Sequence, residues 1–115
     1  MLNVFDTNAV TDGRADKPRK VNLFETPRCF VDVHVLRPGQ VAKVHAHAAE
    51  DKCYHVLSGE GVITLGDMEH RAGPGTLVHC PVEVPHGIRN DGAEILRVLV
   101  FMAPHPRPQE IQSAE

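Results

Sequence analysis

A series of short apolar segments, separated by glycine and proline, constrains the fold of this chain more than any other feature. In RCFVDVHVL (28–36), valines alternate with Asp32 and His34. This period of two is typical of a β-strand, because successive side chains of a strand point to opposite faces. Comparable segments occupy 40–47, 53–57, 62–65, 68–71, 76–80, 86–90 and 93–102. The last could form a helix by composition, but its Val, Ile and Phe residues favour a strand.

The arrangement of these segments predicts one all-β domain. No segment keeps a 3.6-residue period, and about nine short strands joined by turns are typical of a closed barrel or a two-sheet sandwich. A chain of 115 residues has room for a single core. We predict this domain over 21–103. The polar residues 1–20 are expected to form an arm that is flexible or ordered only against a partner chain, and the proline-rich residues 104–115 a loose tail.

Composition excludes several classes of function. Twelve Lys and Arg against 15 Asp and Glu give a net charge of −3, which argues against a nucleic-acid binder or a polybasic membrane patch. The longest unbroken apolar run, Val98–Ala103, is far shorter than the roughly 20 residues of a membrane-spanning helix. Cys29, Cys53 and Cys80 form no CxxC pattern, so we expect free thiols. With no pattern of a secretory signal at the start, a cytoplasmic location is expected.

Among the eight histidines, His45 and His47 form the most informative pair. On a strand, residues i and i+2 project from the same face, so both imidazoles can point into one cavity. Neutral imidazole is a good ligand for Zn, Fe, Ni, Cu or Mn. A His-x-His pair also occurs on surfaces and in cores, so the pair alone leaves the metal site and the structural role both open.

The residues around this pair resemble the two motifs of the cupin family. The first motif is matched by Gly39, His45, His47, Lys52 and Gly59, and the second by Gly75, Pro81, Glu83, His86 and Asn90. The resemblance covers residues 39–90 and implies a single antiparallel jelly-roll barrel. It also implies a divalent transition metal (Zn, Fe, Ni or Mn) held by His45, His47 and His86, a small-molecule ligand, and a homodimer.

Two positions depart from the family pattern: Lys52 stands where the first motif supplies a Glu ligand, and Glu83 where Gly is usual. An ammonium group cannot bind a cation. Lys52 therefore either points outward while three histidines hold the metal, or lines the cavity and pairs with a carboxylate of the substrate. A third alternative is that it replaces the metal as the positive charge of a metal-free pocket. Glu50 shares the parity of position 52 and is a candidate replacement ligand.

The charge of such a site predicts a small anionic ligand. Three neutral imidazoles would leave a divalent ion its full charge of +2, and a nearby Lys52 would strengthen the preference for a carboxylate. Lys52 and Tyr54 are the candidate catalytic or substrate-contacting residues. Four other histidines are expected outside the site: His55 by its parity, His70 and His105 as solvated side chains, and His79 as structural. His34 is assigned a structural role as well, with the cavity as the alternative for both His34 and His79.

Two functions remain compatible with the sequence. The first is a metal-dependent oxygenase, isomerase or lyase acting on a small anionic molecule. The second is a non-catalytic module that binds or senses a small molecule, with or without metal.

Overall fold

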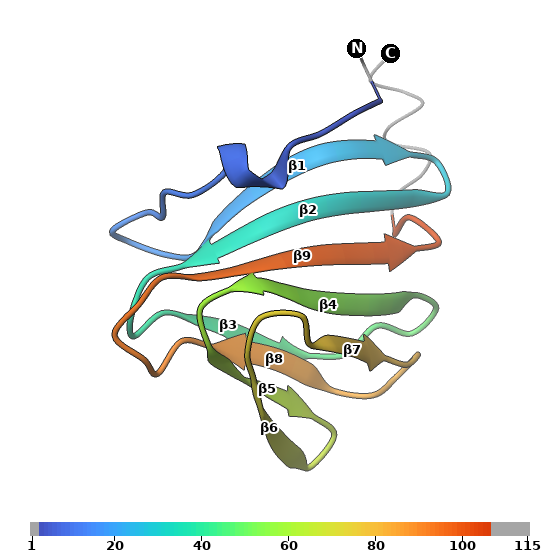
Figure 1. The fold of residues 1–115 in the computed structure, drawn as a ribbon. Coiled ribbons are helices and arrows are strands. Elements are labelled where there is room, and N and C mark those ends of the chain that lie inside the picture. Colours follow the sequence, from blue (N-terminus) through green and yellow to red (C-terminus); the bar gives the residue numbers. More distant parts are fainter. Residues whose placement is uncertain (1–2, 107–115) are drawn as a thin grey trace.

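In a computed structural model of the chain, residues 3–106 are described (Figure 1). These residues form nine strands and one short 3-10 helix, η1. The elements are η1 (Thr7–Ala9), β1 (Arg19–Thr26), β2 (Cys29–Leu36), β3 (Val41–His45), β4 (Asp51–Ser58), β5 (Gly61–Leu65), β6 (Met68–Ala72), β7 (Leu77–Cys80), β8 (His86–Arg89) and β9 (Leu96–Ala103). No helix among them is long and apolar enough to span a bilayer.

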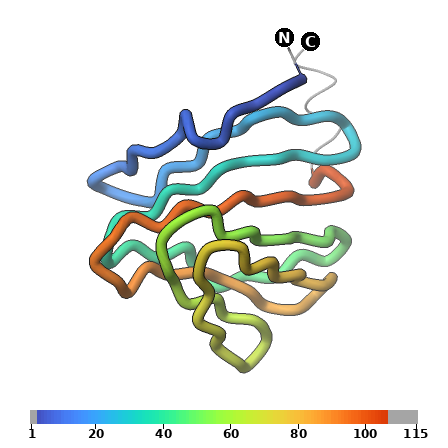
Figure 2. Tube along the Cα trace, in the orientation of Figure 1, coloured from blue at the N-terminus to red at the C-terminus, as the bar shows by residue number. Residues whose placement is uncertain are grey.

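The strands form two antiparallel sheets that face each other (Figures 1 and 2). One has the order β1-β2-β9-β4-β7 and the other the order β3-β8-β5-β6. Only β1 and β2, and β5 and β6, are consecutive strands of the same sheet; every other connection passes from one sheet to the other. This is the predicted all-β jelly roll.

The period of two in the sequence places one set of side chains between the sheets. From β4, for example, Tyr54 and Val56 are buried in the main core, together with Val98 and Val100 of β9. The alternate positions of β2, Val33 and Val35, form a second cluster with Val10 and with partly buried residues of β1, β4 and β9. Burial of these aliphatic side chains is the main stabilising contribution, at about 25 cal/mol per Å² of apolar surface removed from water.

The second cluster explains why the N-terminal segment differs from the predicted arm. Val10 is buried against Val33 and Val35 of the same chain. The guanidinium of Arg97 donates from Nε to the carbonyl of Val10 at 2.7 Å, and from Nη2 to the carbonyl of Thr7. Residues 3–18 therefore have contacts on their own sheet, and β1 begins at Arg19, two residues before the expected domain start.

At the other end of the domain, His105 corrects one prediction. The sequence analysis placed it in solvent, but its side chain is buried, and its Nε2 lies 3.0 Å from the carboxylate of Glu25. Its ring also packs edge-on against Phe30. Residues 107–115 of the expected loose tail lie outside the described residues. The prediction of free thiols is confirmed, since Cys29, Cys53 and Cys80, all within 3–106, are unpaired.

Polar contacts close the end of the barrel opposite the histidines. Buried Asn90 donates to the carbonyls of Leu36 and Glu94 and accepts from the backbone of Gly92, which ties β8 to the turn before β9.

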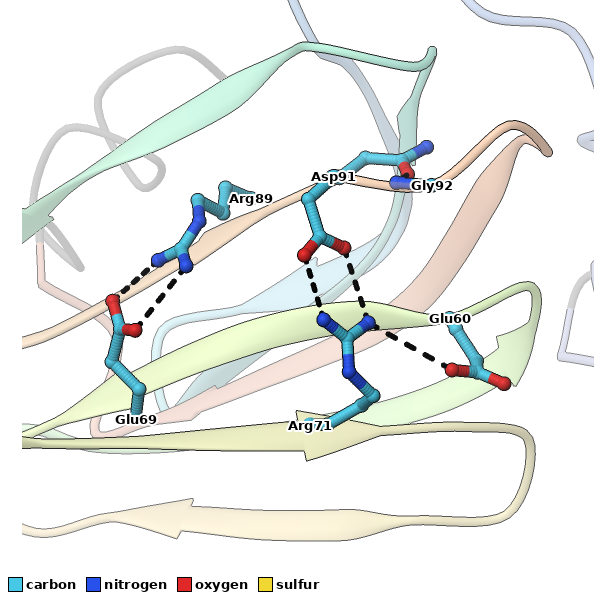
Figure 3. A network of polar contacts seen from close by, with 7 residues as sticks. Glu60, Glu69, Arg71, Arg89, Asp91 and Gly92 are labelled. Carbon is cyan, nitrogen blue, oxygen red and sulfur yellow. Dashed lines mark hydrogen bonds and ion pairs between the residues drawn. The ribbon is translucent and has the colours of Figure 1, made fainter.

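On the outer face of the four-stranded sheet, Arg71 pairs with Asp91 and Glu60, and Arg89 pairs with Glu69 (Figure 3). These last pairs are solvent-exposed, so each contributes little to stability.

Candidate functional site

Three of the predicted ligands come together at one end of the barrel. His45 ends β3, His86 begins β8, and the two are register partners across the sheet. His47 lies two residues beyond β3. The ring centroids are 4.7 Å apart for His45 and His47, 4.7 Å for His45 and His86, and 5.2 Å for His47 and His86.

The sequence analysis expected His45 and His47 to project from the same face of one strand, but the chain brings these rings together differently. The pairing of β3 with β8 shifts register between Ala42 and His45, so the two histidines are not presented by a regular strand. The turn before β8 holds the segment instead, because the backbone N–H of Glu83 donates to the carbonyl of His47 at 2.7 Å. Glu83 has a φ of 68°, a left-handed conformation that favours glycine. This explains why glycine is usual at this position in the motif.

Hydrogen bonds to main-chain oxygens orient two of the rings. The Nδ1 atom of His45 lies 2.9 Å from the carbonyl oxygen of Lys43. The Nδ1 atom of His86 lies 3.0 Å from the carbonyl oxygen of Val84. Because a carbonyl oxygen only accepts, Nδ1 carries the proton in both rings and Nε2 keeps its lone pair. Outer partners of this kind typically hold metal-binding imidazoles in place.

The third ring, His47, has an acidic neighbour. Its Nδ1 lies 3.6 Å from a carboxylate oxygen of Glu50. Glu50 therefore reaches the site as a partner of His47, and it does not belong to the group of possible ligand atoms. Within the described residues, the Nε2 atoms of His47 and His86 are buried and have no hydrogen-bond partner.

Two of the three rings, those of His47 and His86, are in the neutral form that binds metal. Burial lowers the pKa of His86 to about 4, and burial followed by the charge of His45 lowers the pKa of His47, so both are neutral near pH 7. One ligand atom from each histidine lies within 4.8 Å of the others. A metal with bonds of about 2.1 Å needs nitrogens about 3–4 Å apart, which a small rotation of the rings would provide. The three histidines could therefore hold a metal ion.

A cavity of about 500 Å³ adjoins His45. Lys52 and Tyr54 line it from β4, and the Lys52 Nζ lies 5.1 Å from the centre of the Tyr54 ring. Only 7% of Lys52 is exposed, so the alternative in which it points outward is wrong. Burial, and then the charge of Lys20, lower the Lys52 pKa to about 8. The Tyr54 ring lies 6.1 Å from that of His86, and burial raises the pKa of its hydroxyl.

The remaining histidines divide between the cavity and the surface. His34 lines the cavity, the alternative position that the sequence analysis gave for it. His79 is exposed and pairs with Asp51 at 2.8 Å, so it does not reach the site. His70 is exposed, as predicted, and His55 is not among the cavity-lining residues.

Sequence reasoning missed the basic residues at the cavity. Arg14, Lys17 and Lys20 line it from the segment that was assigned to the arm, and Lys43 lines it from β3. One signal in the sequence was available. Position 20 precedes Val21 in a segment that alternates apolar and polar residues, so its side chain points to the face opposite that of Val21. The partner of Lys20 is His34, but this pairing depends on a register between β1 and β2 that the sequence does not reveal.

Comparisons with known proteins agree with this geometry. The cupin domain family matches residues 32–102. Protein SchB from Streptomyces halstedii is 34% identical over 82 residues, which cover 69% of this chain and 58% of SchB. Uncharacterized protein MJ1618 from Methanocaldococcus jannaschii is 29% identical over 83 residues, 72% of this chain and 66% of that protein. The matched regions thus span less than two thirds of these relatives.

Solved structures show the same fold. The crystal structure of TT1209 from Thermus thermophilus is similar to this chain with a TM-score of 0.86 and 36% identity, covering 90% of this chain and 98% of that chain. The family match extends over more than half of the sequence and includes both motifs. The chain therefore belongs to the cupin domain family.

Proposed function

We propose that this protein binds a divalent transition metal through His45, His47 and His86 and binds a small carboxylate anion in the adjoining cavity. The observation that carries the proposal is the state of the three rings. Two of them donate Nδ1–H to main-chain carbonyls. Two have a buried Nε2 without a hydrogen-bond partner in the described structure. A buried, unsatisfied nitrogen costs about 1–3 kcal/mol, and a bound metal would remove this cost.

The other residues of the cavity have separate roles in this proposal. The ammonium of Lys52, which is buried away from water, pairs with the carboxylate of the ligand. Tyr54 keeps its proton, because its pKa is raised, and its hydroxyl can donate a hydrogen bond. The metal, when bound, supplies a Lewis acid next to the anion. Such a site suits an oxygenase, an isomerase or a lyase, and Zn, Fe, Ni and Mn all suit its donors.

A second function is favoured by one specific observation. Lys52 occupies the position where the family motif supplies a Glu ligand, and its charge is buried in the cavity. A metal-free pocket that binds or senses an anion through Lys52 is the alternative proposal. In that case the protein is a non-catalytic module.

Location and assembly belong to the proposal as well. We propose a cytoplasmic homodimer. Three free cysteines suit a reducing compartment. Exposed apolar side chains on the outer face of the five-stranded sheet, such as Leu77 and Phe101, would be covered in a dimer. Light scattering during gel filtration measures the mass directly.

Metal content tests the main proposal. Untagged protein is incubated with Zn, Fe, Ni or Mn, freed of excess ion and assayed for metal. We expect about one equivalent of metal per chain, and loss of that metal in the double variant His45→Ala/His86→Ala. The exposed His70 provides a matched control, since His70→Ala should keep the full equivalent. Absence of metal from all three proteins would overturn the metal centre and leave the metal-free pocket.

A further inference from the structure

We propose that the ligand of this cavity carries two anionic groups, the second of which binds at a basic entrance made by Arg14, Lys17, Lys20 and Lys43. The inference rests on the proposed function, because it takes the cavity beside the histidines as the ligand site. It goes further by naming the class of ligand. A dicarboxylate and a phosphorylated carboxylic acid both have this chemistry.

The charge of the lining is the first argument. The protein as a whole has a net charge of −3. Yet the cavity lining includes five of its 12 Lys and Arg residues, and among the described residues that line the cavity none is Asp or Glu. Of these five, only Arg14 has a close acidic partner among residues 3–106: Asp16, at 3.0 Å on the exposed segment before β1. A concave surface of one sign attracts ligands of the opposite sign.

Repulsion within the cavity is the second argument. Lys20 lies close enough to lower the pKa of both Lys52 and His34. Asp32 acts in the opposite direction on the same two groups. However, the carboxylate of Asp32 also accepts a hydrogen bond from the side chain of Asn22 at 2.8 Å, so it does not serve Lys20 and Lys52 alone. Like charges gathered in one cavity destabilise the free protein, and an anionic ligand would remove this cost.

A buried histidine offers a further polar atom to a ligand. His34 lines the cavity with only 5% of its surface exposed. Its Nε2 lies 3.5 Å from the Asp32 carboxylate and, within residues 3–106, has no hydrogen-bond partner. Since buried polar atoms are normally satisfied, a polar ligand group in the cavity could complete the partners of this atom beside Asp32.

The basic groups lie at two depths, which is why we infer two anionic groups. Lys52 and His34 are buried at the inner end. Arg14, Lys17, Lys20 and Lys43 are exposed and belong to the N-terminal segment, β1 and β3. A ligand with two anionic groups could contact both sets at once. A volume of about 500 Å³ also exceeds what one small carboxylate needs and lies within the usual range of ligand sites.

Calorimetry with matched acids tests the inference. The probes are malonate, succinate, glutarate and adipate, each compared with the monocarboxylate of the same chain length, and 3-phosphoglycerate compared with glycerate. We expect at least one dianion to bind about tenfold or more tightly than its monoanionic partner. Preference for a diacid or for the phosphate compound identifies the source of the second charge.

Variants of the entrance locate the second group. Lys17→Gln and Lys20→Gln should each lower the affinity for the preferred dianion by about tenfold, and the affinity for the matched monoanion by no more than about threefold. Arg28→Gln is the control, because Arg28 is exposed, carries the same charge and does not line the cavity. It should leave both affinities as they are. Thermal melts of each variant check that the fold is intact.

The failures of the two proposals are distinguishable. Equal binding of every dianion and its monoanion would overturn the two-anion inference and leave the proposed carboxylate site standing. Loss of dianion preference in Arg28→Gln to the same extent would overturn the basic entrance. If no acid in either series bound, with or without metal, the anion site itself would be wrong, and the inference would fail with it.

Discussion

Lys52 shows how a single residue can be kept at a cost to stability. It is 7% exposed, and the groups around it are Lys20 on β1, Asp32 on β2 and Cys80 on β7. Burial dominates over these charges and lowers its pKa from 10.5 to about 8. At pH 7 the buried lysine is still charged, and the folded state carries the cost of that charge. A ligand anion would account for keeping a lysine there.

The cost predicts a stabilising substitution. Lys52→Met should raise the free energy of unfolding at pH 7, by up to about 3 kcal/mol, because a shift of one pKa unit corresponds to about 1.4 kcal/mol. The advantage should shrink as the pH rises from about 8 to 10.5. In this range Lys52 is neutral in the folded wild type and protonated in the unfolded wild type, so the wild type's free energy of unfolding increases with pH. Urea denaturation at pH 7 and pH 10 measures both. A constant difference between the two proteins at these pH values would contradict the argument.

At the residue scale, the sequence predicted that His45, His47 and His86 come together, but it did not predict the other residues of the cavity. Motif spacing brings His45, His47 and His86 together, and the structure places their rings beside one another. Lys20 and His34 could not be assigned to the cavity in the same way. Their places depend on which strand pairs with which and in which register, and these are non-local properties.

At the scale of elements, two turns of the first motif serve different purposes. Gly39 and Gly59 have φ values of 86° and 80°, so both favour glycine. A Cβ on Gly59 would clash with the carbonyl oxygen of Ile95, whereas nothing lies within 4 Å of a Cβ on Gly39. Gly59 therefore allows the turn after β4 to lie against the start of β9.

This difference predicts unequal costs for the same change. Gly39→Ala should destabilise the protein by about 1–2 kcal/mol, the cost of the left-handed conformation alone. Gly59→Ala should cost at least about 2 kcal/mol more, because the backbone must also move away. Comparison of the two variants by urea denaturation provides the measurement, and an insoluble Gly59→Ala agrees with the prediction. Equal stabilities would show that the close approach to Ile95 is unimportant.

The elements themselves were predicted with uneven success. Alternation identified β2 and β4 closely, although only β4 buries alternate residues, while the last four residues of β2 are buried on both faces. The segment 40–47 was predicted as one strand, but β3 ends at His45. Its irregular pairing with β8 has no counterpart in the hydrophobic pattern, because β3 is mostly exposed and carries little alternation.

At the scale of the molecule, the N-terminal segment links the fold to the site. Arg97 and the cluster around Val10 hold residues 7–10 on the outer face of the five-stranded sheet. The chain then continues past Arg14 and Lys17, which line the cavity, into β1. The sequence showed the basic stretch but not this anchoring, because the contacts with Arg97 span almost the full chain.

X-ray absorption spectroscopy of the metal-loaded protein tests the central claim most directly, because it counts imidazole ligands around the ion. We predict scattering from three imidazole rings in the wild type and from two in His45→Gln, whose exposed position at the end of β3 makes the change tolerable to the fold. The His70→Gln protein should give the wild-type spectrum. A wild-type spectrum without imidazole scattering, or one that His45→Gln leaves unchanged, would contradict the three-histidine centre.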